Sequence, residues 1–144
     1  MRFQDFFLAI GLVLVTSCSS FHRDWRATVA QPTPTDLSGA WEGQWHSIQT
    51  DHRGKLRCLV TPSETQTGHY NFNYWAKWGL LSGAFATVYP VTEVAAKRWR
   101  FAGDTDLGSM GGVYHHDGQA SPTRFYADFK SSKGDQGTMH MTRP

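Results

Sequence analysis

Residues 69–78 have the sequence HYNFNYWAKW, in which large apolar side chains alternate with polar ones. Tyr70, Phe72, Tyr74 and Trp78 share one parity, whereas the two asparagines between them share the other. Successive side chains of a β-strand point to opposite faces, so this alternation predicts a strand with one buried face. A helix of this length would instead repeat its apolar residues at intervals of three and four.

Shorter runs with the same alternation follow along the chain from residue 37 onward. Their predicted inward positions are Trp41, Gly43, Trp45, Ser47, Leu56, Cys58, Val60, Phe85, Thr87, Tyr89, Trp99, Phe101, Phe125, Ala127, Phe129, Met139 and Met141. Turn residues separate these runs at 51–54, 63–68, 79–83, 90, 104–106, 117–118 and 131–135. With the glycine-rich run 107–114 counted as a strand, the breaks predict eight strands and no amphipathic helix. We therefore expect an all-β fold, an eight-stranded antiparallel up-and-down barrel, because closure removes the exposed sheet edges.

Composition excludes several classes of protein. The chain has 144 residues, of which 14% are aromatic, and its formal net charge is +2. This length suits a single folded domain, and the aromatic content is too high for a disordered chain. The weak, dispersed charge argues against a nucleic-acid partner.

The N-terminus has the features of a secretion signal. Its apolar core spans residues 6–15, which is short of the ~20 apolar residues that a membrane-spanning helix needs. We therefore expect residues 1–17 to be a signal peptide rather than part of the fold.

The end of this leader, Val15-Thr16-Ser17-Cys18, resembles the lipobox of bacterial lipoproteins. The resemblance implies cleavage before Cys18, lipidation of its thiol and a membrane partner through the lipid anchor. Because Ser19 follows the cysteine, it also implies the outer membrane if the host is Gram-negative. An ordinary secretory signal and a retained membrane helix remain the alternatives.

The remaining chain divides into a spacer and a barrel. Residues 18–36 are polar, lack a sustained period and contain two prolines, so we expect a mostly disordered tether in which Phe21 and Trp25 could rest on the membrane interface or on the domain. Residues 37–144 form the predicted barrel. Lipidation of Cys18 would leave Cys58 without a disulfide partner, and its parity predicts a buried, inert thiol.

The segment Leu37-Ser38-Gly39-Ala40-Trp41 resembles the opening of calycin barrels, the lipocalins and avidins, in which a Gly-x-Trp begins the first strand. In those families an arginine near the end of the last strand often packs over this tryptophan. Arg143 has the inward parity of Met139 and Met141, so the resemblance implies that Gly39, Trp41 and Arg143 form a structural signature. Such a cation–π contact contributes about 0.5–2 kcal/mol.

Function depends on what fills the interior. The predicted inward aromatic residues are Trp41, Trp45, Tyr70, Phe72, Tyr74, Trp78, Phe85, Tyr89, Trp99, Phe101, Phe125 and Phe129. Either these rings leave a cavity for a small apolar ligand, or they fill the barrel, since eight strands enclose little more than their own side chains. In the first case the expected ligand-binding residues are Trp45, Tyr70, Tyr74 and Tyr89. In the second case the protein would act through its outer surface on an envelope protein, in envelope maintenance or enzyme inhibition.

No catalytic residue, metal site or cofactor is expected. The segment His115-His116-Asp117 is predicted at a hairpin tip as solvated turn residues, and neighbouring strand residues face opposite ways, which disfavours a shared metal ion. The glycine-rich segment 103–112 has neither the lysine nor the following helix of a phosphate loop. Its glycines are expected to form bulges or to let the backbone pass beneath large rings.

Overall fold

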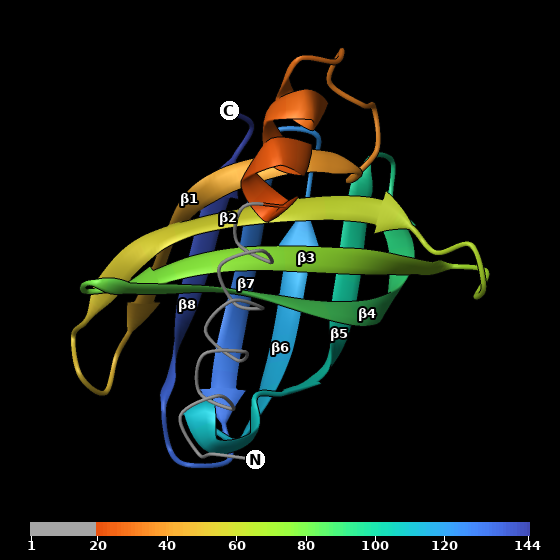
Figure 1. Ribbon diagram of the computed structural model, residues 1–144. Helices are drawn as coiled ribbons and strands as arrows, with labels where there is room; N and C mark the ends of the chain where they lie inside the picture. Colours follow the sequence, from red (N-terminus) through yellow and green to blue (C-terminus); the bar gives the residue numbers. More distant parts are fainter. Residues whose placement is uncertain (1–19) are drawn as a thin grey trace, which may run out of the picture.

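The structure is a computed structural model that describes residues 20–144, so the predicted signal peptide and Cys18 lie outside the described residues. Its eight strands form a closed antiparallel barrel in simple sequence order, with β1 also paired to β8 (Figure 1). The strands are β1 Gly39–Ser47, β2 Arg53–Pro62, β3 His69–Trp78, β4 Leu81–Ala95, β5 Arg98–Asp106, β6 Val113–Ala120, β7 Arg124–Ser131 and β8 Gln136–Thr142. The predicted eight-stranded up-and-down barrel is confirmed.

The interior follows the predicted parity. All twelve predicted aromatic residues belong to the barrel core or pack against it. Cys58 is fully buried as a free thiol, and burial raises its pKa well above the ordinary value, as expected of an inert cysteine. Apolar side chains at every second position therefore account for the core of the molecule.

One end of the barrel is densely packed. The ring of Phe72 lies 4.8 Å from that of Phe101 between ring centroids, and Phe101 lies 5.1 Å from Phe125. Trp41 closes this end, with the guanidinium carbon of Arg143 3.8 Å from the centre of its ring. Arg143 also donates hydrogen bonds to the backbone oxygens of Asp36, Ser38, Ala40 and Pro122. The predicted contact between Arg143 and Trp41 is thus present.

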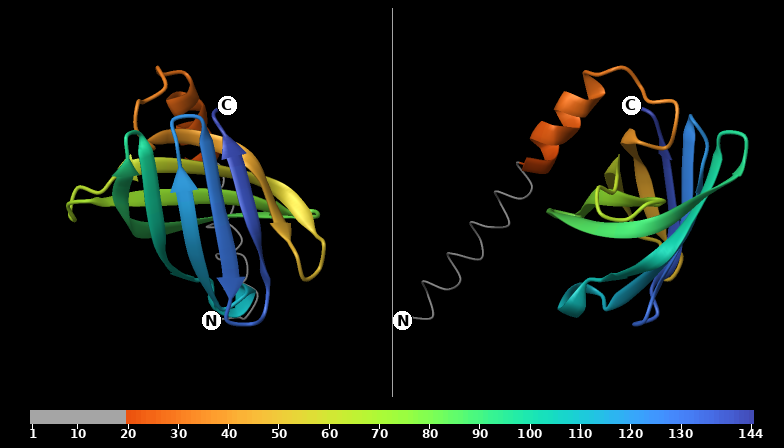
Figure 2. Two further views of the ribbon diagram at one scale, coloured as in Figure 1. Left: turned by 180° about the vertical axis from the view of Figure 1, so that it is seen from behind. Right: turned by 90° about the vertical axis from the view of Figure 1, so that its right-hand side faces the viewer.

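The break predicted at Pro90 is wrong, because Pro90 lies inside the long strand β4. The strand pairs with β3 as far as Pro90 and with β5 from Val91 onward. A proline, which has no backbone N–H to donate, is tolerated where the strand changes partners. Before this point β4 and β5 diverge, which Figure 2 shows as a splayed side of the barrel.

Two further turns lie later than predicted. Residues 104–106 continue β5, and residues 117–118 lie within β6, opposite Ala102 and Phe101 of β5. Gly118 is a contact position rather than a turn, since a Cβ atom there would lie 2.2 Å from the Phe101 ring. The glycine-rich run predicted as a strand instead contains a short 3₁₀ helix, Gly108–Met110.

The predicted disordered tether is also wrong in part, because residues 20–29 form a helix against the outer wall of the barrel (Figure 2). Phe21 and Trp25, one helical turn apart, are each only 7% exposed and pack with Ala40 and Leu59. Arg57 lies over the Trp25 ring at 3.8 Å. Burial of these two large rings against the barrel stabilises the helix. Across residues 20–144, no helix is long and apolar enough to cross a bilayer.

Candidate functional site

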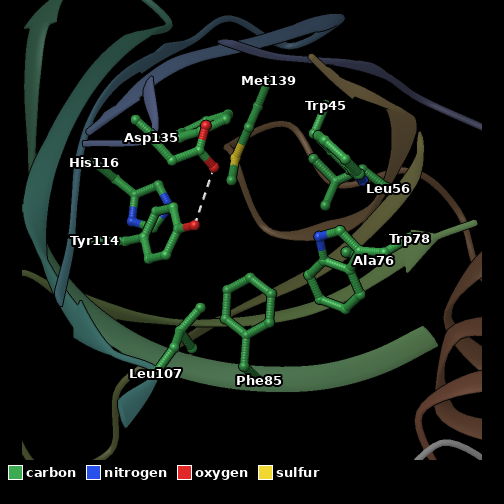
Figure 3. Close-up of a pocket in the computed structure, with 11 residues that line it drawn as sticks. Trp45, Leu56, Ala76, Trp78, Phe85, Leu107, Tyr114, His116, Asp135 and Met139 are labelled. Atoms are coloured by element: carbon green, nitrogen blue, oxygen red, sulfur yellow. Dashed lines mark hydrogen bonds between the residues drawn. The ribbon is translucent and has the colours of Figure 1, made fainter. Parts of the chain in front are cut away.

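A pocket of about 70 Å³ lies inside the barrel at the end opposite Trp41 (Figure 3). Its walls come from all strands except β5, together with the segments that follow β5 and β7. The lining residues are Trp45, Leu56, Ala76, Trp78, Phe85, Leu107, Tyr114, His116, Phe129, Asp135 and Met139. The closed barrel thus brings together side chains that are far apart in the sequence.

Asp135 organises the polar side of this pocket. One carboxylate oxygen accepts a hydrogen bond of 2.6 Å from Ser47 Oγ, and the other accepts one of 3.1 Å from the Tyr114 hydroxyl. Burial and the nearby Asp135 charge raise the pKa of Tyr114, so its hydroxyl remains a donor at neutral pH. These two donors hold the carboxylate in one orientation beside the pocket, and Figure 3 shows the bond from Tyr114.

His116 forms the deepest polar part of the wall. Its side chain is 1% exposed, and its Nδ1 lies 2.8 Å from the Tyr89 hydroxyl. Burial, assisted by the neighbouring His115, lowers the pKa of His116 to about 4. The imidazole is therefore neutral at physiological pH and contributes hydrogen-bonding capacity without charge.

Aromatic rings form the apolar side. The rings of Trp45 and Trp78 lie 6.3 Å apart, and Trp45 Nε1 donates to the backbone oxygen of Lys77 at 3.0 Å. This bond uses the polar atom of the Trp45 indole, so the ring offers its apolar surface to a ligand. In Figure 3, Trp78 and Phe85 lie across the pocket from Asp135.

The volume sets the size of what can enter. One water needs roughly 10–15 Å³ of cavity volume, so the pocket holds a handful of water molecules or one small organic molecule. A fatty acyl chain exceeds this space. The pocket suits a compact ligand with an apolar part and one polar group.

The four predicted ligand-binding residues separate in the structure. Trp45 lines the pocket, whereas Tyr70 lies at the other end of the barrel, 3.4 Å from an Asp36 carboxylate oxygen. Tyr74 and Tyr89 are fully buried in the packed interior. Tyr89 reaches the pocket only indirectly, through His116. All three tyrosines point inward, as predicted, but they lie at different depths along the barrel axis. The alternation of apolar and polar residues predicts the face of a side chain and not its depth.

The prediction that His116 is a solvated turn residue is wrong. His116 lies within β6 and points inward. His115 faces outward, and its Nδ1 lies within hydrogen-bond distance, 2.7 Å, of Asp104 Oδ1. Tyr114 and His116 have the same parity on β6 and therefore point to the same side. The turn predicted at 117–118 places His116 in a loop, so this shared parity is missed. Within residues 20–144, no group of three or more His, Cys, Asp or Glu side chains is placed to hold a metal ion.

In the segment 103–112, the backbone at two glycines packs directly against tyrosine rings, as predicted. A Cβ atom at Gly103 would lie 2.5 Å from the Tyr89 ring, and one at Gly111 would lie 2.6 Å from the Tyr114 ring. Both tyrosines belong to the site or contact it. The predicted close approach of backbone and rings is thus present at Gly103 and Gly111.

Comparison with known proteins finds no matching family model and no matching curated protein sequence. Among solved structures, the chain is similar to a redesigned β-barrel, with 19% sequence identity and a TM-score of 0.53. The match covers 75% of this chain and 91% of the redesigned barrel. At this identity the similarity shows the barrel fold alone.

Proposed function

We propose that this protein is a lipid-anchored, non-enzymatic binding protein that holds one small molecule in the pocket between Trp45 and Asp135. The observation that carries the proposal is the contrast between the two ends of the barrel. Rings fill the end at Trp41, whereas the other end keeps a pocket of about 70 Å³ lined by both rings and polar groups. An evolved core is normally packed without such voids.

The wall chemistry defines the class of ligand. Trp45, Trp78 and Phe85 offer apolar surface, and Asp135 and His116 offer polar atoms on the other side. Small-molecule sites commonly combine an apolar lining with a few oriented polar groups. The ligand is therefore a compact, ring-bearing or branched apolar molecule that carries one polar group.

The anchoring part of the proposal rests on the leader. Residues 15–18 match the lipobox pattern, and lipidation at Cys18 would hold the barrel at a membrane of the cell envelope. In a Gram-negative host this would be the outer membrane.

The binding proposal is tested by filling the pocket. The intact protein, purified in an uncharged maltoside detergent, is titrated with a panel of ring-bearing and branched compounds of about six to eight non-hydrogen atoms, a size that follows from the volume. We expect saturable shifts of the Trp45 and Trp78 indole N–H signals in NMR spectra. The variant Ala76→Leu, which places bulk in the pocket, should lose at least tenfold in affinity.

Ala86→Leu is the matched control, because Ala86 is exposed on the outer face. It should bind as the original protein does. Shifts that never saturate, or equal affinity in Ala76→Leu and Ala86→Leu, would show that the pocket is not the binding site.

The alternative, a protein that acts through its outer surface on an envelope partner, has one observation in its favour. Leu80 and Leu81 are exposed at the turn between β3 and β4, Leu80 completely. A partner that covered these two leucines would remove apolar surface from water, which favours association. The titration separates the two functions, since this alternative requires no saturable site inside the barrel.

A further inference from the structure

The hydroxyl groups that donate hydrogen bonds to the Asp135 carboxylate are neutral. Ser47 Oγ donates to one carboxylate oxygen at 2.6 Å, and the Tyr114 hydroxyl donates to the other at 3.1 Å. A carboxylate has about four lone-pair positions, so each oxygen can accept one more bond. Among residues 20–144, Asp135 takes part in no ion pair. Its negative charge is therefore unmatched, although the residue is half-buried.

The rest of the pocket wall adds no positive charge. His116 is neutral at physiological pH because burial lowers its pKa to about 4. The other described lining residues are apolar or aromatic, apart from the neutral Tyr114 hydroxyl. The pocket thus has a net charge of −1 in a partly desolvated space, where electrostatic attraction is stronger than in water.

The aromatic walls of the pocket, like its negative charge, favour a positively charged ligand. A ring presents a negative face to a cation, and tryptophan does so most strongly. Trp45 and Trp78 lie together at one wall, with ring centroids 6.3 Å apart, and Phe85 and Tyr114 also border the pocket. Rings around a carboxylate form a site for a cation that is too weakly hydrated to prefer water.

We propose that the pocket selects a small organic ammonium ion, with the cationic nitrogen between the Asp135 carboxylate and the indole rings. This inference rests on the proposed binding function and specifies its ligand class. The pocket volume of about 70 Å³ admits a compact alkylammonium group but excludes a long chain. An inorganic cation is disfavoured, because apolar rings replace most of the oxygen ligands that such an ion requires.

The test compares two probes of equal shape. Choline carries a quaternary ammonium group, and 3,3-dimethylbutan-1-ol is its neutral carbon counterpart. Both are titrated into the intact protein in maltoside detergent at constant chloride concentration, with the Trp45 and Trp78 indole signals as the readout. We expect choline to bind at least tenfold more tightly than the neutral alcohol. Asp135→Asn should abolish this preference while the neutral alcohol still binds, which shows that the pocket remains formed.

Asp128→Asn is the matched control. Asp128 also accepts a tyrosine hydroxyl, that of Tyr126 at 2.6 Å, but it is exposed on the outer face. This variant should keep the preference for choline. Equal binding of the two probes to the original protein would overturn the ammonium inference and leave the binding function standing. Failure of both probes would also overturn the inference, whereas the binding function is judged by the wider panel and Ala76→Leu.

Discussion

His116 illustrates how burial changes the chemistry of a single side chain in this barrel. The folded protein keeps its imidazole neutral, with a pKa lowered by burial to about 4 from an ordinary value of 6.5. The unfolded chain, in contrast, binds a proton at this residue as the pH falls below 6.5. Between these values the unfolded state binds more protons, so stability rises with pH and is lost on acidification.

We expect the free energy of unfolding to fall by about 3 kcal/mol from this residue alone as the pH drops from 7 to 4. Urea titrations across this range should show a shallower pH dependence for His116→Gln, which removes the titrating imidazole. The matched variant His52→Gln alters an exposed histidine and should retain the full dependence. Parallel curves for His116→Gln and the original protein would contradict this account.

At the scale of elements, the helix over residues 20–29 depends on its contact with the barrel. Most helical stability in proteins comes from the packing of an apolar face rather than from the helix alone, so docking and helix formation are coupled here. Trp25 supplies a ring that is 7% exposed and lies beneath the Arg57 guanidinium. The helix should therefore melt when this ring is removed, while the closed barrel persists.

For Trp25→Ala we expect hydrogen exchange at residues 20–29 to accelerate at least tenfold, with exchange in β1–β8 nearly unchanged. Mass spectrometry of deuterated peptides measures both. Val29→Ala, at an exposed position of the same helix, should leave exchange as it is. Retained protection in Trp25→Ala would mean that other contacts hold the helix.

The elements also show where sequence patterns are sufficient. Strand β3 is predicted correctly because its alternation is long and its two ends are marked by turn residues. The β4–β5 break is misplaced because Pro90, a local turn signal, lies where β4 changes partners. The helix is missed because Phe21 and Trp25 give too few apolar residues for a period, and their partners lie on the outer faces of the strands.

At the scale of the whole molecule, the proposed lipid anchor at Cys18 would decide where the protein is located. Cys18→Ala should move the protein out of the membrane fraction and leave an unacylated precursor, because no other thiol is present at the lipobox. Cell fractionation and mass spectrometry of the N-terminal peptide report these changes. Cys58→Ala is the control: this thiol is buried in the core, so membrane association should persist. Unchanged partitioning of Cys18→Ala would exclude lipid anchoring.

The sequence alone determined the all-β class, the inward face of the barrel, the burial of Cys58 and the contact between Arg143 and Trp41. The first three follow from parity, which each strand carries within its own residues, whereas the contact between Arg143 and Trp41 was implied by the resemblance to calycin barrels. Tertiary structure decided the depth of each side chain along the barrel axis and hence the site. Ser47, Tyr114 and Asp135 come from β1, β6 and the β7–β8 turn, and they meet because the barrel closes. Register and closure are long-range properties, so a local pattern could identify Trp45 as a wall residue but not the Asp135 carboxylate on the other side of the pocket.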